Sequence, residues 1–521
     1  MPKTKTPARQ IYAVGGLALP PEATAYGLAR YSRSDQPARQ TFTAMAEKIL
    51  QGNDAMKRFF EVFYFQYGHA SIADLAHVAM AIENISMIAA MDVVDEQLWD
   101  GQERSTRYQH FSPEAVHTPV SVTRSKRLQQ HYRTGINYLM SEYEKLYSDL
   151  LAAVREQNPL PKHYSESAYK SATRARAFDM ARYLLPLGTL TSVGQITSGR
   201  TLEKMISRLL SSEYSEIRSV AADIKTACQT PAFNPFSNEI TAALHDLGKK
   251  LKTNPAACRT IRRLQQVLQA NQPLPTLIKY TAPMSYGITT KQQLRQVAKK
   301  LLKIKQIDSS TDVTAFAQQD PLVEAVSTAV YWVTHYSYAQ IYGQVKRWSR
   351  KQLRAIFELT IKHRGTHDEL LRALDTHSVT FDILMDAGSY RDMHRHRRTI
   401  QVAQDFTYQH GYDMHLELGK YGGQYPYQLA MDTITATLQK LERTNHEAAV
   451  YLMPMGFKRR ALFKMSWNEI DYIGKLRTGG GRHLSYWKIA LRMVEEAAKI
   501  SPERAKHIPT TPLSADSVYE R

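Results

Sequence analysis

The sequence predicts an α+β protein with two similar halves, each holding a small mixed or antiparallel sheet packed with long helices. Apolar residues recur at helical spacing through most of the chain. Two short segments instead alternate apolar and polar residues, as half-buried strands do. A third observation, the similarity of two distant segments to each other, predicts the two halves.

The composition is that of a folded and strongly basic protein. Of the 521 residues, 43% are hydrophobic and 22% are charged, which is richer in apolar side chains than a disordered chain. The length exceeds that of one ordinary hydrophobic core, so we expect at least two domains. A formal net charge of +19 favours polyanionic partners, which include nucleotides, phosphate-bearing cofactors and nucleic acids.

The cysteine pattern indicates a reducing compartment. Cys228 and Cys258 are the two cysteines, and they show neither CxxC spacing nor clustering with histidine. This excludes a disulfide framework and a zinc knuckle, so we expect no metal site and a cytoplasmic location. The apolar stretch near the start is short and ends in prolines, unlike a signal peptide. No segment approaches the roughly 18 apolar residues of a membrane span.

Helical spacing and the two strand patterns follow the same order in each half. The first strand pattern, "AHVAMAIENIS", places Val78, Met80 and Ile82 on one side, and the second, "SVTFDILMDAG", alternates Val379, Phe381, Ile383 and Met385. Long helices also follow the second strand, to about residue 500. The helical spacing covers residues 39–66, 124–156, 167–185, 200–226 and 312–363.

Similar segments around Pro186 and Pro454 indicate an internal duplication. "RAFDMARYLLPLGTLTSVGQITSGRTLEKMISRL" is similar to "HEAAVYLMPMGFKRRALFKMSWNEIDYIGKLRT", with Pro186 and Pro454 separated by 268 positions. Prolines interrupt helix between residues 273 and 283, and the segment before them is basic and helical. We therefore predict domains at residues 1–235 and 276–521, with an intervening helical segment at residues 236–275.

Each half carries a polar cluster after its strand. In the first half, Glu103, Ser105, Arg107 and Tyr108 can grip a nucleotide through phosphate, sugar or base, although a solvated, salt-bridged loop has the same composition. In the second half, residues 395–398 read Arg-His-Arg-Arg and cannot all be buried without anionic partners. A cofactor pyrophosphate, a nucleic acid and a solvated helix end remain alternatives for this second cluster.

The ordered series of motifs resembles the flavin-dependent thymidylate synthases, the ThyX family. The resemblance spans most of residues 20–225 through "YGHASIAD", "QERSTRY", "ARYLLPLGTLT" and "SGRTLEKMISRLLSSEYSEIR". It is fainter over residues 350–500, through "MHRHRRTIQ", "YLMPMG" and "KLRTGGGRHLSYWKIA". It implies conversion of dUMP to dTMP with FAD, and with NADPH and methylenetetrahydrofolate as co-substrates. The alternative is a diverged pseudoenzyme that binds flavin, nucleotide or nucleic acid without this activity.

The two halves depart from the family pattern in complementary ways. The first half has Asp-Glu-Gln at residues 95–97 where the second keeps Arg-His-Arg at residues 395–397. The second half has Ala403, Asp405 and Thr407 where the first keeps the nucleotide motif. Because family members are homotetramers with shared sites, the resemblance implies a pseudo-dimer of the two halves. Two chains would then form a pseudo-tetramer.

The resemblance also implies roles for individual residues. The alternatives are a helix cap for His69, an N-cap for Ser71 and surface ion pairs for the helix arginines Arg208 and Arg477. His483, after "GGGR", is an anion contact through a glycine-rich turn, with the alternative that the three glycines simply terminate a helix. The expected cofactor contacts are His69, Ser71, Arg200, Arg395, His396 and Arg397; the expected substrate contacts are Glu103, Ser105, Arg107, Tyr108 and Arg182; and the expected catalytic residues are Arg477 and Arg208.

Overall fold

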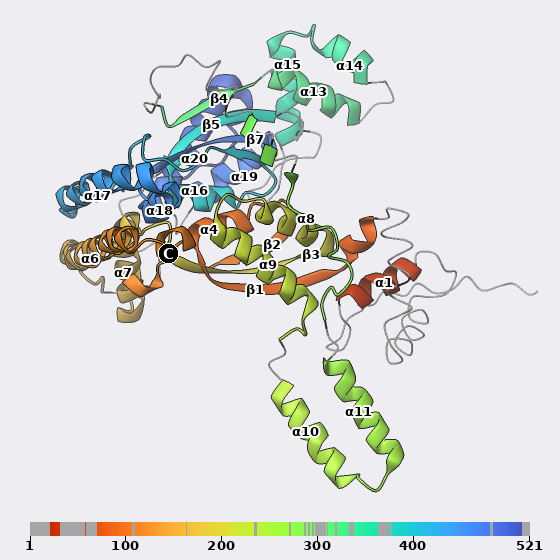
Figure 1. The fold of residues 1–521 in the computed structure, drawn as a ribbon. Coiled ribbons are helices and arrows are strands. Elements are labelled where there is room, and N and C mark those ends of the chain that lie inside the picture. The colour runs from red at the N-terminus through yellow and green to blue at the C-terminus, as the bar shows by residue number, and fades with distance from the viewer. Residues whose placement is uncertain are drawn as a thin grey trace, which may run out of the picture. The chain divides into compact units, whose positions relative to one another are not determined.

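Helices and two small antiparallel sheets make up the computed structural model (Figure 1), which confirms the predicted α+β class. The sheet orders are β1-β3-β2 and β4-β5-β7-β6. The structure describes residues 21–31, 58, 70–106, 110–162, 164–233, 237–269, 272–285, 288–289, 292–293, 296, 309, 311–317, 320–332, 338–362, 374, 378–479 and 483–512.

The chain forms two compact units, each assembled from segments that are not consecutive. Unit 1 comprises Met1–Glu83, Leu98–Gln102 and Val193–Val297. Unit 2 comprises Asn84–Gln97, Glu103–Ser192 and Ala298–Arg521. The boundaries predicted at residues 235 and 276 remain predictions.

The boundary between the units crosses the strands of the first sheet, so its elements belong to both. In β1, Val78, Ile82 and Ile85 are buried and Met80 is half-buried, in agreement with the predicted alternation. The elements of this part of the chain are α1 Pro21–Tyr31, η2 Ala70–Leu75, β1 His77–Ser86, β2 Trp99–Glu103, β3 Leu190–Ser198, α8 Gly199–Leu210, α9 Ser215–Gln229, α10 Ser237–Lys250 and α11 Pro255–Gln269.

The first half of the chain contributes a further run of helices to unit 2. These confirm the helical spacing predicted over residues 124–156 and 167–185, whereas the prediction over residues 39–66 lies outside the described residues. The helices are α4 Met87–Val93, η3 Pro113–Ala115, α5 Val120–Thr123, α6 Lys126–Gln157, α7 Glu166–Ala181 and η4 Arg182–Leu184.

The second sheet lies wholly in unit 2, and its strand β5 is the predicted strand. Val379, Phe381, Ile383 and Met385 are all fully buried there. β5 pairs antiparallel with β4 and β7, and β6 pairs antiparallel with β7. The strands are β4 Val313–Phe316, β5 Ser378–Asp386, β6 Ile400–Ala403 and β7 Lys458–Ser466.

The other described elements that lie wholly in unit 2 are helices. The prediction of continuous helical spacing over residues 312–363 is wrong. Residues 312–363 are not helical throughout, because β4 joins the edge of the sheet beside β5. None of the helices in the described ranges has the length and apolarity needed to cross a bilayer. The remaining helices are α13 Pro321–Trp332, α14 Tyr338–Val345, α15 Arg350–Ile361, α16 Ala387–His394, α17 Gln424–Thr444, α18 His446–Leu452, α19 Trp467–Thr478, α20 Leu484–Ile500 and α21 Pro502–Ala505.

The two halves of the chain have the same order of elements. The order β1-β3-β2 matches β5-β7-β6, with β4 added at the edge. α4 and α16 directly follow the first strand of each set, and α8 and α19 directly follow the central strand.

Equivalent loops of the two halves pair with each other inside unit 2. Pro186 and Pro454 form an antiparallel bridge. Leu187 N donates to Met453 O at 2.8 Å, and Met455 N donates to Leu185 O at 2.9 Å. Exchanging each residue for the one 268 positions away converts the first hydrogen bond into the second. The pairing therefore has local two-fold symmetry in the backbone.

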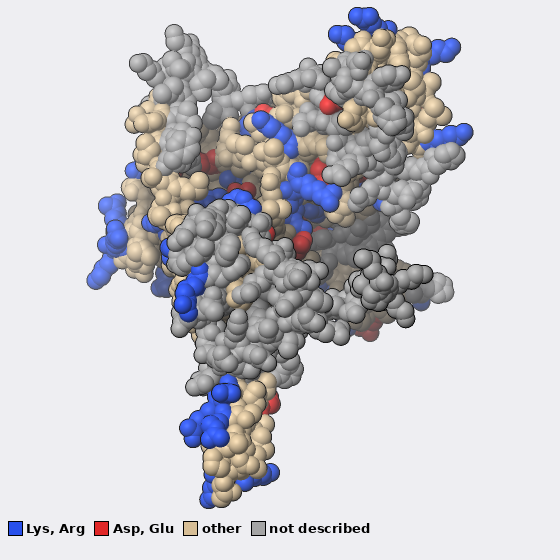
Figure 2. Space-filling model, turned by 90° about the vertical axis from the view of Figure 1, so that its right-hand side faces the viewer, with Lys and Arg blue, Asp and Glu red and all other residues tan. Residues whose placement is uncertain are grey.

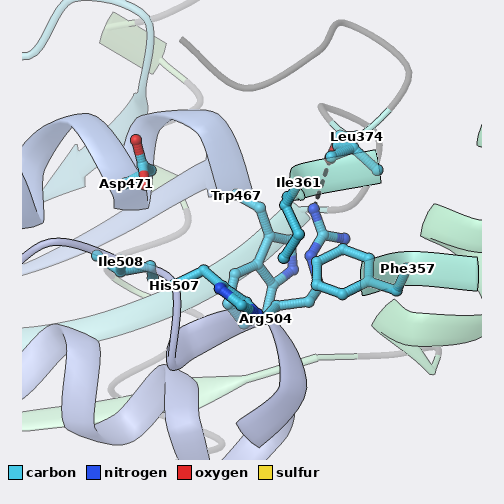
Figure 3. A pocket seen from close by; sticks show the side chains of 8 residues that line it. All are labelled: Phe357, Ile361, Leu374, Trp467, Asp471, Arg504, His507 and Ile508. Carbon is cyan, nitrogen blue, oxygen red and sulfur yellow. Dashed lines mark hydrogen bonds between the residues drawn. The ribbon is translucent and has the colours of Figure 1, made fainter. Parts of the chain in front are cut away.

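A buried arginine joins the α13–α15 helices to α19 and α21. Arg504 donates to Pro321 O at 3.2 Å and Leu374 O at 2.5 Å, and its guanidinium lies over the Trp467 ring at 4.7 Å. Figure 3 shows this arrangement around a small cavity of about 10 Å³, close to the volume that one water needs. The cavity is lined by Phe357, Ile361, Leu374, Trp467, Asp471, Arg504, His507 and Ile508. The residues around Arg504 therefore form a packed core.

The two-fold loop pairing requires glycine at position 456. A Cβ there would overlap the Tyr427 hydroxyl and lie 3.3 Å from Tyr183 O. We expect Gly456→Ala to lower the free energy of unfolding by about 1–3 kcal/mol, because the buried Tyr427 must move to admit the methyl group. Denaturant unfolding measures this. Gly343→Ala is the control, since no atom lies within 4 Å of its added Cβ; equal stability of the Gly456 variant and the parent would contradict the argument.

Candidate arginine-lined site

The site is built on α16, which begins where β5 ends. The Asp386 carboxylate accepts hydrogen bonds from Ser389 N at 2.7 Å and from the Ser389 hydroxyl at 2.6 Å, which caps the helix. Arg391, Asp392 and Arg395 then follow at spacings of three and four residues, so they lie near one another on the helix surface. The capped start of α16 therefore fixes the positions of these charged side chains.

A buried ion pair connects α16 to the end of β2. Arg391 donates through Nη2 to Glu103 Oε1, and only 7% and 5% of the two side chains are exposed. Arg391 Nη2 also lies 3.4 Å from Arg104 O. Glu103, predicted as a substrate contact, is thus held by an arginine from the second half of the chain.

Arg182 contributes a second guanidinium to the site from η4. Its Nη1 donates to Thr106 Oγ1 at 3.0 Å, and its Nη2 lies 3.8 Å from Asp392 Oδ2. The next residue, Tyr183, is fully buried, with its hydroxyl hydrogen-bonded to the Ser485 hydroxyl. The buried Tyr183 anchors η4, and Arg182 is placed accordingly.

Asp392 is the carboxylate around which the arginines gather. Burial opposes its ionisation, but the guanidiniums of Arg395, Arg182 and Arg477 outweigh burial and hold the pKa of Asp392 well below its ordinary value. Arg395 donates through Nη2 to Asp392 Oδ1. Burial in turn opposes the charge of Arg395, yet Asp392 and Glu103 raise the pKa of that guanidinium.

Arg477 enters the site from α19 and is oriented by His396. Its Nε donates to His396 Nε2 at 2.8 Å, and its Nη2 donates to Asp392 O at 2.6 Å. Burial, Arg477 and Arg395 lower the pKa of His396 well below its usual range, so the imidazole is neutral and accepts this hydrogen bond. Burial also lowers the pKa of Arg477 despite the nearby Asp392.

These side chains carry more positive than negative charge. The arginine cluster, which we define as Arg182, Arg391, Arg395 and Arg477, faces the carboxylates of Glu103 and Asp392. Four guanidiniums against two carboxylates leave two positive charges in excess, or one when Asp386 is also ionised. Within the described residues, Arg182 Nε, Arg182 Nη2 and Arg395 Nε are buried and donate no hydrogen bond. Buried donors of this kind are costly unless an anion accepts from them.

His483 has a structural place beside this site. Its Nδ1 accepts from Ser485 N at 3.3 Å and caps α20. Its Nε2 lies 3.4 Å from Asp179 O, and its ring stacks on Tyr183 with centroids 6.1 Å apart. Of the two sequence interpretations, termination of a helix agrees with this geometry, because α19 ends at Thr478 with Gly479 as its C-cap; the His483 cap of α20 was not predicted.

The structure brings together part of the predicted set of site residues. Glu103, Arg182, Arg395, His396 and Arg477 lie in one connected group in unit 2, and Ser105 lies two residues beyond Glu103. Unit 1 holds the others that can be placed: Arg200 pairs with Asp74 at 2.9 Å, Arg208 lies on α8, and Ser71 lies in η2 with its side chain outside the description. The predicted residues His69, Arg107 and Tyr108, together with the side chain of Ser71, are outside the described part of the chain.

Sequence reasoning missed three residues of the site, namely Arg391, Asp392 and Thr106. The i, i+4 spacing of Arg391 and Arg395 on a helix was a usable signal for the first of these. Thr106 gave no signal, because its contact with Arg182 joins residues separated by 76 positions.

We expect the free energy of unfolding to depend on pH because of Asp386, whose side chain caps α16. Burial and the Asp413 carboxylate raise the pKa of Asp386 to about 6, above the value of about 3.9 in an unfolded chain. The folded protein therefore binds this proton more tightly, and we expect the free energy of unfolding to fall as the pH rises from about 4 to about 6. Asp386→Asn keeps a capping side chain and should remove about 2–3 kcal/mol of this fall.

Urea unfolding across this pH range measures the difference between the Asn variant and the parent. Asp149→Asn, on the exposed face of α6, is the control and should keep the pH dependence of the parent. Parallel pH profiles for the parent and Asp386→Asn would contradict the assignment.

Comparisons with known proteins agree with the sequence resemblance. Residues 18–232 match the family described as "Thymidylate synthase complementing protein". A UPF0159 protein of Chlamydia pneumoniae is 24% identical over 85% of this chain and 78% of its own length. A UPF0159 protein of Thermoplasma acidophilum is 21% identical over 92% of this chain and 93% of its own length.

Among solved structures, a UMP/dUMP methylase PolB from Streptomyces cacaoi, bound with 5-Br dUMP, is 15% identical with a TM-score of 0.29. The match covers 38% of this chain and 94% of that one. The ThyX resemblance of the sequence is confirmed by the family match. The match to the thymidylate synthase complementing proteins covers residues 18–232, so the likeness to that family is established over this part of the chain.

Proposed function

We propose that this protein is a flavin-dependent thymidylate synthase-like enzyme that converts dUMP to dTMP. The observation that carries the proposal is the arginine cluster with its excess positive charge and its buried, unsatisfied guanidinium nitrogens. A nucleotide phosphate carries about two negative charges and accepts several hydrogen bonds, so it complements this cluster in both charge and hydrogen bonding. NADPH and methylenetetrahydrofolate would be the co-substrates.

The assignment of residues to ligands extends this proposal. Glu103, Ser105, Arg107, Tyr108 and Arg182 would hold dUMP, with Arg182 donating to its phosphate. The flavin contacts in unit 2 would be Arg395, His396 and Arg397, and His69, Ser71 and Arg200 of unit 1 stay predicted cofactor contacts. FAD would supply the reducing electrons for methyl formation at uracil C5. The buried arginine cluster fits a phosphate of either ligand, which supports both assignments.

Arg477 would act on the uracil ring. His396 and the Asp392 carbonyl fix two of its nitrogens, so the guanidinium keeps one orientation before substrate binds. A preorganised cation of this kind stabilises negative charge that develops on the base. Arg208, its counterpart on α8, is the second proposed catalytic arginine.

The state of the cysteines supports a mechanism without a thiolate nucleophile. Cys228 is buried in α9, and burial raises the pKa of its thiol to about 12. A thiol with that pKa is not ionised at neutral pH and attacks carbon poorly. Cys258 lies on α11 and is outside every motif that resembles the family. Flavin-dependent methylation needs no such nucleophile.

We further infer that the two halves arose by duplication and pair as a pseudo-dimer. The matching orders β1-β3-β2 and β5-β7-β6 support this, as does the symmetric Pro186–Pro454 bridge. The competent site would combine Glu103 from the first half with Arg395 and Arg477 from the second. Two chains would form a homodimer equivalent to a tetramer.

One observation favours a second candidate, a binding protein without thymidylate synthase activity. Glu103 is engaged by Arg391 in a buried ion pair, so its carboxylate already has a partner where the family motif would contact substrate. In this alternative the arginine cluster binds a nucleotide phosphate and no methyl transfer follows.

The first test is the reaction itself. We expect the purified protein to be yellow, with a flavin band near about 450 nm, and to form dTMP only when dUMP, methylenetetrahydrofolate and NADPH are all present. Arg397→Ala should lose bound flavin. Arg398→Ala should keep it, because that side chain is mostly exposed and lies beside Glu469. Binding of dUMP without dTMP formation, in protein reconstituted with FAD, would favour the binding protein over the enzyme.

Arg182 tests the nucleotide assignment. Arg182→Met keeps the length of the buried side chain but removes its charge and donors. We expect the dissociation constant for dUMP to rise at least about 30-fold, while the unliganded protein unfolds at an equal or higher temperature. Titration calorimetry measures the dissociation constant for dUMP, and scanning calorimetry measures the unfolding temperature. Arg174→Met, an exposed position on α7, the helix directly before η4, should change neither value; unchanged dUMP affinity in the Arg182 variant would rule out its phosphate contact.

A further inference from the structure

The helices α10 and α11 form a hairpin within unit 1 (Figure 1). Residues 251–254 connect them, and Asn254 Oδ1 accepts hydrogen bonds from Ala256 N and Ala257 N, each at 3.1 Å. Pro255 occupies the first turn of α11, where its missing N–H costs no hydrogen bond. The turn is therefore well defined by its own residues.

The hairpin is exposed along nearly all of its described length. Ile261 is the buried residue among those described in the two helices, and Leu247 and Leu264 remain 44% and 46% exposed. The two helices contact each other but bury few side chains. A segment with this little burial adds little to a hydrophobic core, so its surface is free for another purpose.

The charge of the hairpin is strongly one-sided. Its acidic residues are Glu239 and Asp246, and Asp246 lies 3.9 Å from His245. Figure 2 shows blue side chains along one side and at the end of the hairpin, at the bottom of the view. None of its lysines and arginines forms an ion pair with a described residue; they are Lys249, Lys250, Lys252, Arg259, Arg262 and Arg263, all exposed.

The arginines of α11 share one face of the helix. Arg259, Arg262 and Arg263 are spaced three and four residues apart, opposite the apolar residues Ile261 and Leu264. Like charges at this spacing repel one another and destabilise a helix. Phosphates spaced along a backbone would remove that repulsion, and Arg can bind each of them through two donors. The face is thus suited to a polyanion.

The composition of the hairpin indicates which polyanion it suits. Residues 237–269 contain no Phe, Tyr or Trp. Single-stranded nucleic acids are held by aromatic side chains that stack on the bases, and this surface offers none. Contacts from Lys and Arg to the phosphates of a double helix need no stacking and carry no sequence information. We propose that the α10–α11 hairpin binds the phosphate backbone of duplex nucleic acid without reading its sequence.

The experiment measures fluorescence anisotropy of a labelled duplex of about 20 base pairs with the full-length protein, from about 50 to 200 mM salt. The test variant carries Arg259→Gln, Arg262→Gln and Arg263→Gln, since Gln keeps helix propensity. We expect its duplex affinity to fall at least about tenfold, and the slope of log affinity against log salt to shrink by about 2–3. Binding of dUMP should not change.

The matched control changes exposed cations on α6, through Lys126→Gln, Arg127→Gln and Arg133→Gln. It should retain duplex affinity to within about twofold, and circular dichroism should show equal helix content in both variants. The proposal is overturned by duplex binding of the test variant at parent strength, or by an equal loss in the control. Preference for a single strand of the same length, or displacement of the duplex by poly-glutamate at a matched charge concentration, would overturn it as well.

Discussion

The burial of guanidiniums around Asp392 is the constraint on which the interior of unit 2 depends. Isolated buried charges are strongly disfavoured, so each arginine must find an acceptor. The Asp392 carboxylate compensates the charges of Arg395, Arg182 and Arg477. The Glu103 carboxylate compensates the charge of Arg391. Two carboxylates cannot neutralise four guanidiniums or accept hydrogen bonds from all of their nitrogens. The remaining donors are available to an anionic ligand. Stability and ligand binding therefore compete for the same side chains.

The backbone pairing at Pro186 and Pro454 explains how residues separated by almost 300 positions reach one site. The loop before Pro186 continues from η4, which carries Arg182, and the loop around Pro454 leads into β7 and then α19, which carries Arg477. Gly388 N donates to Met455 O at 3.3 Å, and a Cβ added at Gly388 would lie 3.9 Å from Arg182 Nη2, so the start of α16 meets both loops. The loops thus bring arginines from both halves to Asp392.

The sequence predicted the strands whose apolar residues alternate and the helices with strong periodicity, because burial on one face produces both patterns. It did not predict β3 or β7. In β3 the buried positions include Thr191, Gln195 and Thr197, so no apolar alternation appears. In the site, residues of a shared motif such as Arg395 and His396 were found, whereas Thr106 was not. A contact between separate segments leaves no local pattern.

The Glu103–Arg391 pair also gives a physical reason for the complementary losses in the two halves. Under the proposed duplication, positions 91 and 403 correspond to 391 and 103, and there the chain has Met91 and Ala403. Removing one partner of a buried ion pair leaves an uncompensated charge, whereas replacing both by apolar residues costs little or stabilises the fold. Motif residues that pair across the halves would therefore disappear together. A duplicated protein would keep one complete constellation and lose the other, instead of weakening both equally.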